Sequence, residues 1–333
     1  MARILVTDTF YMESDGGFRG PGFLVIQSGS ITGKGLGEPP PEAQYAEMVV
    51  GGEHKVAIPS FASPPLLLEA YALRMQLEQA DCEGCITETL KAVAKLSARQ
   101  AYYSSLVAAY ELTLMGVTRI IAVSMHPSST VKAIEDAGAE GVVLVPRGCG
   151  VEVNVGELQL DARAQGRVRL GVLSCSRAEG VEPSDVVARL EPDGSVEIQL
   201  PDGRAVRGYV DGRLGSGMIL PMHPWRFSPW AIMALSGSKM GQAYYWLMAR
   251  DLHKLFDEGY KVLEGKAQVL LLDLSEPPCW VPSLKDVRPW ALCAATPRIE
   301  LLVSGDRIVV DSGHHMFIGP SALREAALEL SSL

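Results

Sequence analysis

Two histidines are the side chains of this sequence best placed to do chemistry. His126 lies in "AVSMHPSS", directly after an apolar stretch that is typical of a buried strand. An imidazole at the end of such a strand could contact a ligand or act as a general base, because it gains and loses a proton near neutral pH. The alternative is a loop histidine beside a proline, with no chemical role.

The second histidine, His223, lies in the aromatic loop "LPMHPWRFSPW" together with Trp225 and Arg226. These side chains could line a pocket for a planar or anionic ligand, or the loop could be a proline-stiffened packing element. We therefore predict a ligand pocket of His126, His223, Trp225 and Arg226. If the chain is an active hydrolase, the candidate catalytic side chains are His126, His223 and Asp211.

The cysteines suggest weaker alternatives. Cys82 and Cys85 form a lone C-x-x-C, and a structural zinc site would need a second pair. Cys149 follows a predicted strand and could be a nucleophile paired with His126. Six cysteines in 333 residues do not make a disulfide scaffold, so we expect reduced thiols.

The elements that would position these residues follow an α/β order in the first half. Residues 64–116 carry apolar residues three and four apart and predict helices, the first beginning at the prolines of this stretch. An apolar strand at 117–124, a short helix at 128–140 and a second apolar strand at 141–146 follow. This alternation predicts a parallel sheet.

The rest of the chain predicts antiparallel strands and further helices. Residues 1–57 read as short strands, with a hairpin turn at Ser28-Gly29. Two Pro-Asp-Gly turns within 185–210 predict a three-stranded meander. Residues 228–259 are helical in pattern, and strands return from 268 onward before a terminal helix.

The composition is that of a soluble globular protein. Hydrophobic residues make up 47% and charged residues 21% of the chain. A net charge of −9 argues against nucleic acid as a partner. No apolar stretch approaches the ~20 residues that cross a bilayer, and "MARILVTDTF" is not a signal peptide. We therefore expect a cytoplasmic protein that does not bind membranes.

Several short motifs, taken in order, resemble the amidohydrolase superfamily, in particular its nucleobase-deaminase and chlorohydrolase-like branch. They are "LVIQSGSITGKG", "HKVAIPSFA", "SSLVAAYELTLMGVTRIIAV", "LEGKAQVLLLDL" and "IELLVSGDRIVVDSG". The resemblance implies a composite β-sandwich domain built from 1–57 and 264–333, around a (β/α) TIM-like barrel at 58–263. That segment is short for a barrel, which typically occupies about 250 residues. We therefore expect a truncated or remodelled barrel carrying the meander.

The same resemblance implies a zinc or iron ion that activates water. It would place two histidine ligands at positions 65 and 67, where this chain has Pro65 and Leu67. It would place an aspartate near position 217, where this chain has Gly217. No histidine lies between His126 and His223, so the ligand set is absent as a whole.

Three hypotheses follow. The first is an amidohydrolase-like protein without the metal centre, which needs no cofactor and binds a small molecule or has a regulatory role. The second is an active hydrolase of non-peptide carbon–nitrogen bonds with an atypical site, and only this hypothesis calls for zinc or iron. The third is a non-catalytic structural subunit of an oligomer, including a homo-oligomer.

Overall fold

The chain divides into two compact units. The computed structural model describes residues 3–78, 85–151, 153, 166–175, 186–191, 195–209, 218–219, 222–236, 238–281, 283–284, 287–331 and 333. The first unit comprises 1–62, 113–118 and 228–316, and the second comprises 63–112, 119–227 and 317–333. Within the described residues, no helix is both long and apolar enough to pass through a bilayer.

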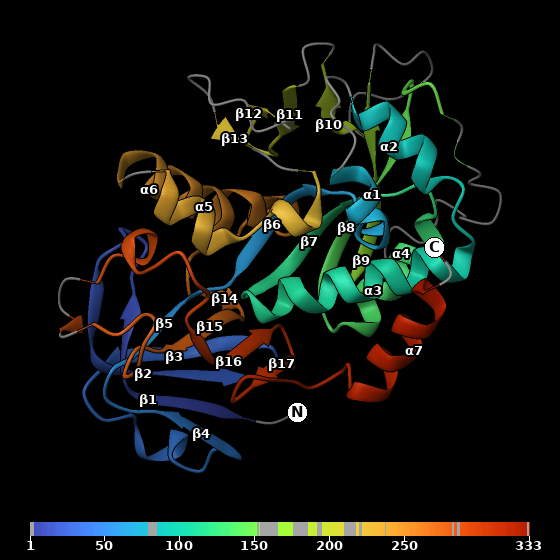
Figure 1. Cartoon of the computed structure of the whole chain (residues 1–333). Helices are drawn as coiled ribbons and strands as arrows, with labels where there is room; N and C mark the ends of the chain where they lie inside the picture. Colours follow the sequence, from blue (N-terminus) through green and yellow to red (C-terminus); the bar gives the residue numbers. More distant parts are fainter. Residues whose placement is uncertain are drawn as a thin grey trace. The chain divides into compact units, whose positions relative to one another are not determined.

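The first unit contains a sheet that has ten strands among the described residues. They are β1 (Ile4–Met12), β2 (Phe18–Gln27), β3 (Ser30–Leu36), β4 (Met48–Gly51), β5 (Lys55–Pro59), β14 (Gly265–Lys266), β15 (Gln268–Asp273), β16 (Arg298–Ser304), β17 (Arg307–Asp311) and β18 (His314–His315). Their order is β14-β3-β2-β1-β5-β15-β16-β17-β18, and β4 pairs with β1 (Figure 1).

Both ends of the chain therefore contribute to one sheet. They meet where β5 pairs antiparallel with β15, for example Ile58 with Leu270. The hairpin predicted at Ser28-Gly29 is confirmed, because β2 and β3 are antiparallel across it. Ser28 and Gly29 have φ values of 52° and 77°, which match the right-handed twist of the flanking strands.

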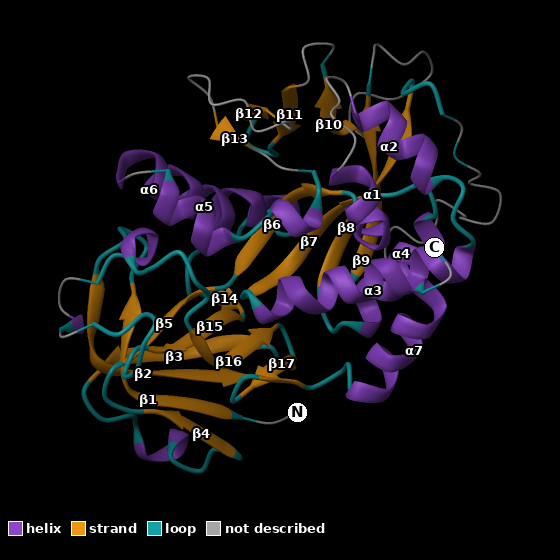
Figure 2. Cartoon of the chain, viewed as in Figure 1, coloured by secondary structure: helices purple, strands orange, loops and turns teal. Residues whose placement is uncertain are grey.

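The second sheet has eight strands among the described residues. They are β6 (Phe61–Leu66), β7 (Val117–Val123), β8 (Glu140–Arg147), β9 (Val168–Ser174), β10 (Val186–Leu190), β11 (Ser195–Gln199), β12 (Ala205–Tyr209) and β13 (Met218–Ile219). Their order is β13-β12-β11-β10-β9-β8-β7-β6. The parallel part of this sheet is curled into half a barrel (Figure 2). The predicted α/β class is confirmed.

The register shows how this sheet changes direction. β7, β8 and β9 are parallel neighbours, and β10 is parallel to β9. β11 is antiparallel to both β10 and β12, so the meander predicted at 185–210 is confirmed. The turn at Pro201-Asp202-Gly203 decides the β11–β12 pairing locally, which is why the sequence pattern was sufficient there.

Helices connect and flank these strands. They are α1 (Arg74–Glu78), α2 (Cys85–Val93), α3 (Ala98–Leu114), α4 (Pro127–Asp136), α5 (Pro229–Leu235), α6 (Ser238–Trp246) and α7 (Pro320–Leu330). α4 connects β7 to β8, so the predicted strand–helix–strand order is confirmed. Its buried residues include Ala133 and Ile134. Its first residue is Pro127, and proline is well tolerated there because the N–H at a helix start has no partner within the helix.

The helix predicted to begin at the prolines of 64–65 begins later. Pro64 and Pro65 belong to β6, which lies at the edge of its sheet. A proline cannot donate to a ladder, but an edge strand leaves one side without a strand partner, so it accepts proline. A 3-10 helix, η2, then begins at Leu68 and ends at Leu73.

Candidate functional site

The site of interest lies in the loops that follow the strands of the second sheet. β7, β8 and β9 are parallel, so their carboxyl ends share one edge of the sheet. In α/β barrels this is the edge where ligand and catalytic sites form. In this protein His126 follows β7, Cys149 follows β8, and Cys175 follows β9.

The segment after β6 has become part of the protein core. Pro65 and Leu67 are buried, and Leu67 is 2% exposed. The Leu67 backbone N–H donates to the carbonyl oxygen of Met222 at 2.7 Å. Neither the proline ring nor the leucine side chain offers a lone pair, so these two positions cannot bind a metal.

Glu69, on η2, is the polar centre of this segment. Its side chain is fully buried. Oε1 accepts hydrogen bonds from the Ser124 hydroxyl, from the His126 N–H at 2.8 Å and from the Thr130 hydroxyl at 2.9 Å. Oε2 accepts from the Met125 N–H at 2.9 Å. All four partners donate, so the pocket is built for an ionised carboxylate.

These contacts place Glu69 at the amino-terminal end of α4, where backbone N–H groups have no partner within the helix and the helix dipole favours negative charge. The carboxylate fixes the loop that carries His126. Sequence reasoning missed Glu69. The available signal was an acidic residue inside the apolar run "PPLLLEAYAL", since a buried charge requires a dedicated set of partners.

His126 is half-buried and precedes the first residue of α4. Its Nε2 atom lies 3.2 Å from the carbonyl oxygen of Val93, the last residue of α2. The carbonyl can only accept, so Nε2 carries the proton in this contact. The ring is thus held by α2 while its backbone N–H is held by Glu69.

His223 lies directly before the short 3-10 helix η5 (Pro224–Arg226). Its ring centroid is 4.6 Å from that of Trp225, and the two rings are tilted by 47°. Arg226 is exposed. The neighbouring Met222 carbonyl accepts from Leu67, so the loops of His126 and His223 are both attached to the segment 67–69. Asp211 and Gly217 lie outside the described residues.

Tyr71 is a further titratable group on η2. Its hydroxyl donates to Glu111 on α3. Burial, followed by this hydrogen bond to a carboxylate, raises the pKa of Tyr71 above its ordinary value. Tyr71 therefore stays a neutral donor near neutral pH.

The described residues do not fit the divalent metal that the resemblance implies. Pro65 and Leu67 have no donor atoms, and both oxygens of Glu69 are already engaged by protein donors. Within the described ranges, no three His, Cys, Asp or Glu side chains come together as a metal-binding group.

Two disulfides correct the expectation of reduced thiols. Cys149 is bonded to Cys175 in the second unit, and Cys279 to Cys293 in the first. In this form Cys149 is not a nucleophile for His126 to activate. Sequence spacing could not show the pairing, because the Cys149 partner comes from the next strand of the sheet. Cys82 lies outside the described residues.

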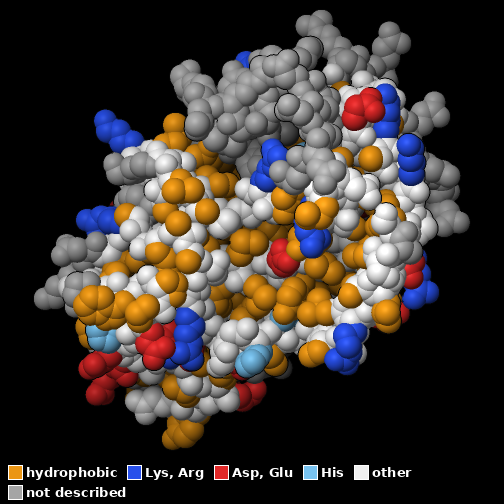
Figure 3. All heavy atoms as spheres, viewed as in Figure 1, with side chains coloured by type: hydrophobic (Ala, Val, Ile, Leu, Met, Phe, Trp, Pro, Cys, Tyr) orange, Lys and Arg blue, Asp and Glu red, His pale blue; other side chains and the backbone are white. Residues whose placement is uncertain are grey.

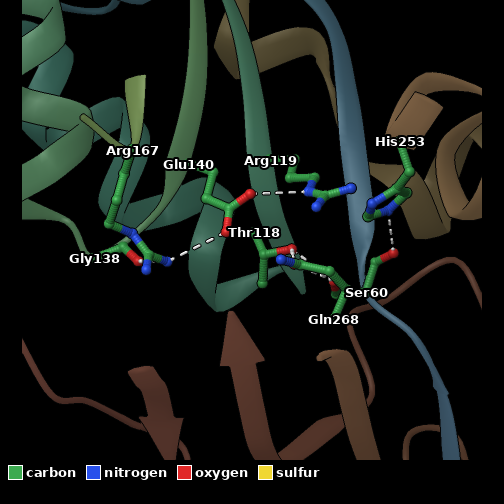
Figure 4. Close-up of polar contacts among 8 residues, drawn as sticks. All are labelled: Ser60, Thr118, Arg119, Gly138, Glu140, Arg167, His253 and Gln268. Atoms are coloured by element: carbon green, nitrogen blue, oxygen red, sulfur yellow. Dashed lines mark hydrogen bonds and ion pairs between the residues drawn. The ribbon is translucent and has the colours of Figure 1, made fainter. Parts of the chain in front are cut away.

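A buried ion cluster lies at the opposite, amino-terminal end of the parallel strands. Arg119 of β7 donates through Nε to Glu140, the first residue of β8, at 3.1 Å, and Arg167 lies 3.6 Å from the same carboxylate (Figure 4). Arg167 also reaches the Gly138 carbonyl at 3.5 Å. Polar clusters at this end of a barrel serve stability rather than catalysis. The signal was an arginine inside the apolar run "VTRIIAV".

The first unit has its own buried polar network. The hydroxyls of Ser60 and Thr118 lie 2.5 Å apart, and Thr118 donates to Gln268 at 2.6 Å. His253 Nε2 donates to the Ser60 carbonyl at 2.9 Å (Figure 4). The His253 ring also stacks on Tyr260. The four residues of this network that form hydrogen bonds are all buried, so the network is structural.

Trp230 is also a core residue of the first unit. It is fully buried, packs edge-on against Phe61 with ring centroids 5.2 Å apart, and donates to the Met115 carbonyl.

Comparison with known proteins adds to this geometry. No protein-family model matches the sequence, and no curated protein matches it either. A triazine hydrolase from Arthrobacter aurescens is similar in structure, with a TM-score of 0.72 and 11% identity over 99% of this chain and 100% of that chain.

Two further solved structures are similar over nearly the whole chain. An amidohydrolase from a Sargasso Sea environmental sample has a TM-score of 0.66 and 12% identity, over 99% of this chain and 98% of that chain. An adenosine deaminase from Xanthomonas campestris with bound zinc has a TM-score of 0.62 and 10% identity, over 99% of both chains. The chain has the fold of these enzymes, and its resemblance to the amidohydrolase superfamily is confirmed at the level of that fold.

Proposed function

We propose that this chain is an amidohydrolase-like protein that binds a small molecule at the carboxyl edge of its parallel sheet and does not carry out metal-dependent hydrolysis. The observation that carries the proposal is the segment 67–69. The resemblance places a metal ligand at position 67, where this segment has a buried leucine, and the nearby Glu69 carboxylate already accepts hydrogen bonds from four protein donors.

The Glu69 carboxylate already accepts four hydrogen bonds from the protein. A cation at Glu69 would compete with these donors, among them the N–H groups of Met125 and His126. Each bond to a charged group contributes about 1.5–3 kcal/mol to stability. If both N–H groups were released, that of Met125 would lose its acceptor, whereas that of His126 would keep the Ser124 Oγ. Use of the carboxylate to fix the His126 loop therefore disfavours its use as a metal ligand.

The names of the similar structures refer to triazines and to adenosine. Triazines and the adenine base of adenosine are planar nitrogen heterocycles. The tilted ring pair of His223 and Trp225 offers aromatic surface, and the exposed Arg226 offers charge. These groups support a planar nitrogen heterocycle as the ligand, with His126 and His223 as hydrogen-bonding contacts.

We also propose a composite domain and a partner other than nucleic acid. The sheet drawn from both chain ends supports the composite domain at 1–57 and 264–333. On the face shown in Figure 3, Lys and Arg side chains stand apart from one another rather than forming a basic patch, which supports a partner other than nucleic acid. We keep a cytoplasmic location and a homo-oligomer as predictions.

The test combines metal analysis with ligand binding. Protein purified without added metal is analysed by plasma mass spectrometry and titrated calorimetrically with adenine, adenosine and a simple triazine. We expect less than stoichiometric zinc and iron, and binding of at least one heterocycle that is lost in His126→Ala and His223→Ala. The matched control is His314→Ala on β18, which should bind normally.

Two results would overturn the proposal. Stoichiometric zinc or iron, with ammonia released from a heterocycle only in its presence, would establish the active-hydrolase alternative. Unchanged binding in both histidine variants would remove the pocket assignment. Absence of binding to every probe, together with a stable oligomer in sedimentation, would instead support the structural-subunit alternative.

A further inference from the structure

We propose that the Cys149–Cys175 disulfide is a redox-sensitive lock that fixes the loop after β8 and, through α2, the ring of His126. The inference goes beyond the proposed function, because it concerns control of the carboxyl edge and needs no ligand to be tested. It rests on the position of the two cysteines, on the backbone around them, and on what their loop contacts.

The disulfide joins the ends of two parallel neighbours. Arg147 and Ser174 are the last paired residues of β8 and β9. Cys175 follows immediately, and its N–H donates to the Arg147 carbonyl at 2.9 Å. The Cα atoms of Cys149 and Cys175 are 4.9 Å apart, within the range that a disulfide spans. The crosslink thus continues the strand ladder beyond its last pair.

The backbone around Cys149 brings it back to this strand end. Gly148 and Gly150 both have φ values of 70°, a left-handed conformation that glycine adopts without the penalty other residues meet. Cys149 is 5% exposed, whereas Cys175 is half-buried. Cys175 is therefore the more exposed of the two cysteines.

The same loop passes near α2. A Cβ atom added at Gly150 would lie 3.9 Å from Thr87 Cγ2, which lies on α2. The last residue of that helix, Val93, holds His126 Nε2 through its carbonyl oxygen. One helix therefore lies near the disulfide loop at its start and holds the candidate ligand-binding histidine at its end.

Closure of the lock is a two-electron oxidation. The Cys175 thiolate attacks a low-molecular-weight disulfide such as oxidised glutathione, forms a mixed disulfide and releases one glutathione thiolate. The Cys149 thiolate then attacks the Cys175 sulfur and releases the second glutathione. The two protons lost by the cysteines appear on the two glutathione thiols, so the oxidant is reduced as the cysteines are oxidised.

The experiment isolates this pair of cysteines. In a background variant, Cys82, Cys85, Cys279 and Cys293 are each replaced by serine, which leaves Cys149 and Cys175 as the only thiols of the six. Peptide mass mapping without reductant follows treatment with oxidised glutathione. Hydrogen–deuterium exchange of peptides covering 85–93 and 124–128 is then compared before and after reduction.

We expect a Cys149–Cys175 crosslinked peptide in the oxidised sample, and exchange about tenfold faster in 85–93 after reduction, because local opening becomes more populated. A further variant with Cys149→Ser and Cys175→Ser should show the exchange of the reduced sample, and added reductant should not change it. If the serine background does not fold, reduction of the unaltered protein against its Cys149→Ser/Cys175→Ser variant gives the same comparison.

Two outcomes would overturn the inference. One is a mapping result in which Cys149 and Cys175 remain thiols after oxidation. The other is a mapped crosslink whose reduction leaves exchange in 85–93 unchanged, which would make the bond a local staple without connection to His126. Neither outcome depends on ligand binding, so both are distinguishable from failure of the proposed function.

Discussion

Replacement of Glu69 by glutamine should destabilise the second unit, although the change removes only a charge and one acceptor atom. In Glu69→Gln the amide oxygen can keep the Oε1 partners Ser124, His126 and Thr130. The amide NH₂ then faces the Met125 N–H, which donates to Oε2 in the native structure. One charge-assisted hydrogen bond is lost and two donors oppose each other, so we expect about 2–3 kcal/mol of lost stability.

Glu69→Ala should lower the stability further, and the structure indicates which donors lose their acceptor. The Met125 N–H loses its acceptor, whereas the His126 N–H keeps the Ser124 Oγ at 3.1 Å. The hydroxyls of Ser124 and Thr130 keep each other at 3.1 Å. One stranded donor at about 1–3 kcal/mol, the other lost bonds and the small cavity together give about 4 kcal/mol.

The assay is urea unfolding followed by circular dichroism, with the slope of free energy against urea compared between variants. The matched control is Glu88→Gln on α2, which removes an exposed ion pair with Lys91 and should change stability by less than about 0.5 kcal/mol. The reasoning fails if Glu69→Gln unfolds like the control, or if Glu69→Ala is no less stable than Glu69→Gln.

Three further predictions follow. Glu140→Gln should cost about 3–5 kcal/mol in urea unfolding, because the buried Arg119 loses its ionised partner; a loss below about 1 kcal/mol would contradict this. The raised pKa of Tyr71 means that its contribution to stability is complete below the unfolded pKa of about 10 and is lost as pH rises through the folded pKa. In an ultraviolet titration, Tyr71→Phe should therefore remove one tyrosine from the late phase that accompanies unfolding, and loss from the early phase would refute it. Gly29→Ala should cost about 1–2 kcal/mol in thermal unfolding, because an L-residue is strained at φ 77°, whereas Gly33→Ala on β3 serves as its control.

The predictable part of the fold came from patterns that act over short distances. Ser28-Gly29 set a hairpin, Pro201-Asp202-Gly203 set the β11–β12 pair of the meander, and the apolar runs around His126 set a strand–helix–strand unit. The helix start predicted at Pro64 and Pro65 was wrong, because a strand tolerates these prolines only if it lies at the edge of its sheet, as β6 does. Edge position is a property of the whole sheet and has no local signature.

The candidate site divides in the same way. The sequence alone determined that Pro65 and Leu67 cannot bind a metal, because side-chain chemistry does not depend on folding. Only the tertiary structure decided that Glu69 accepts hydrogen bonds from the β7–α4 loop and that Cys149 pairs with Cys175. Those contacts join residues 26 positions or more apart in the chain, and which distant groups meet is set by strand order and register rather than by local pattern.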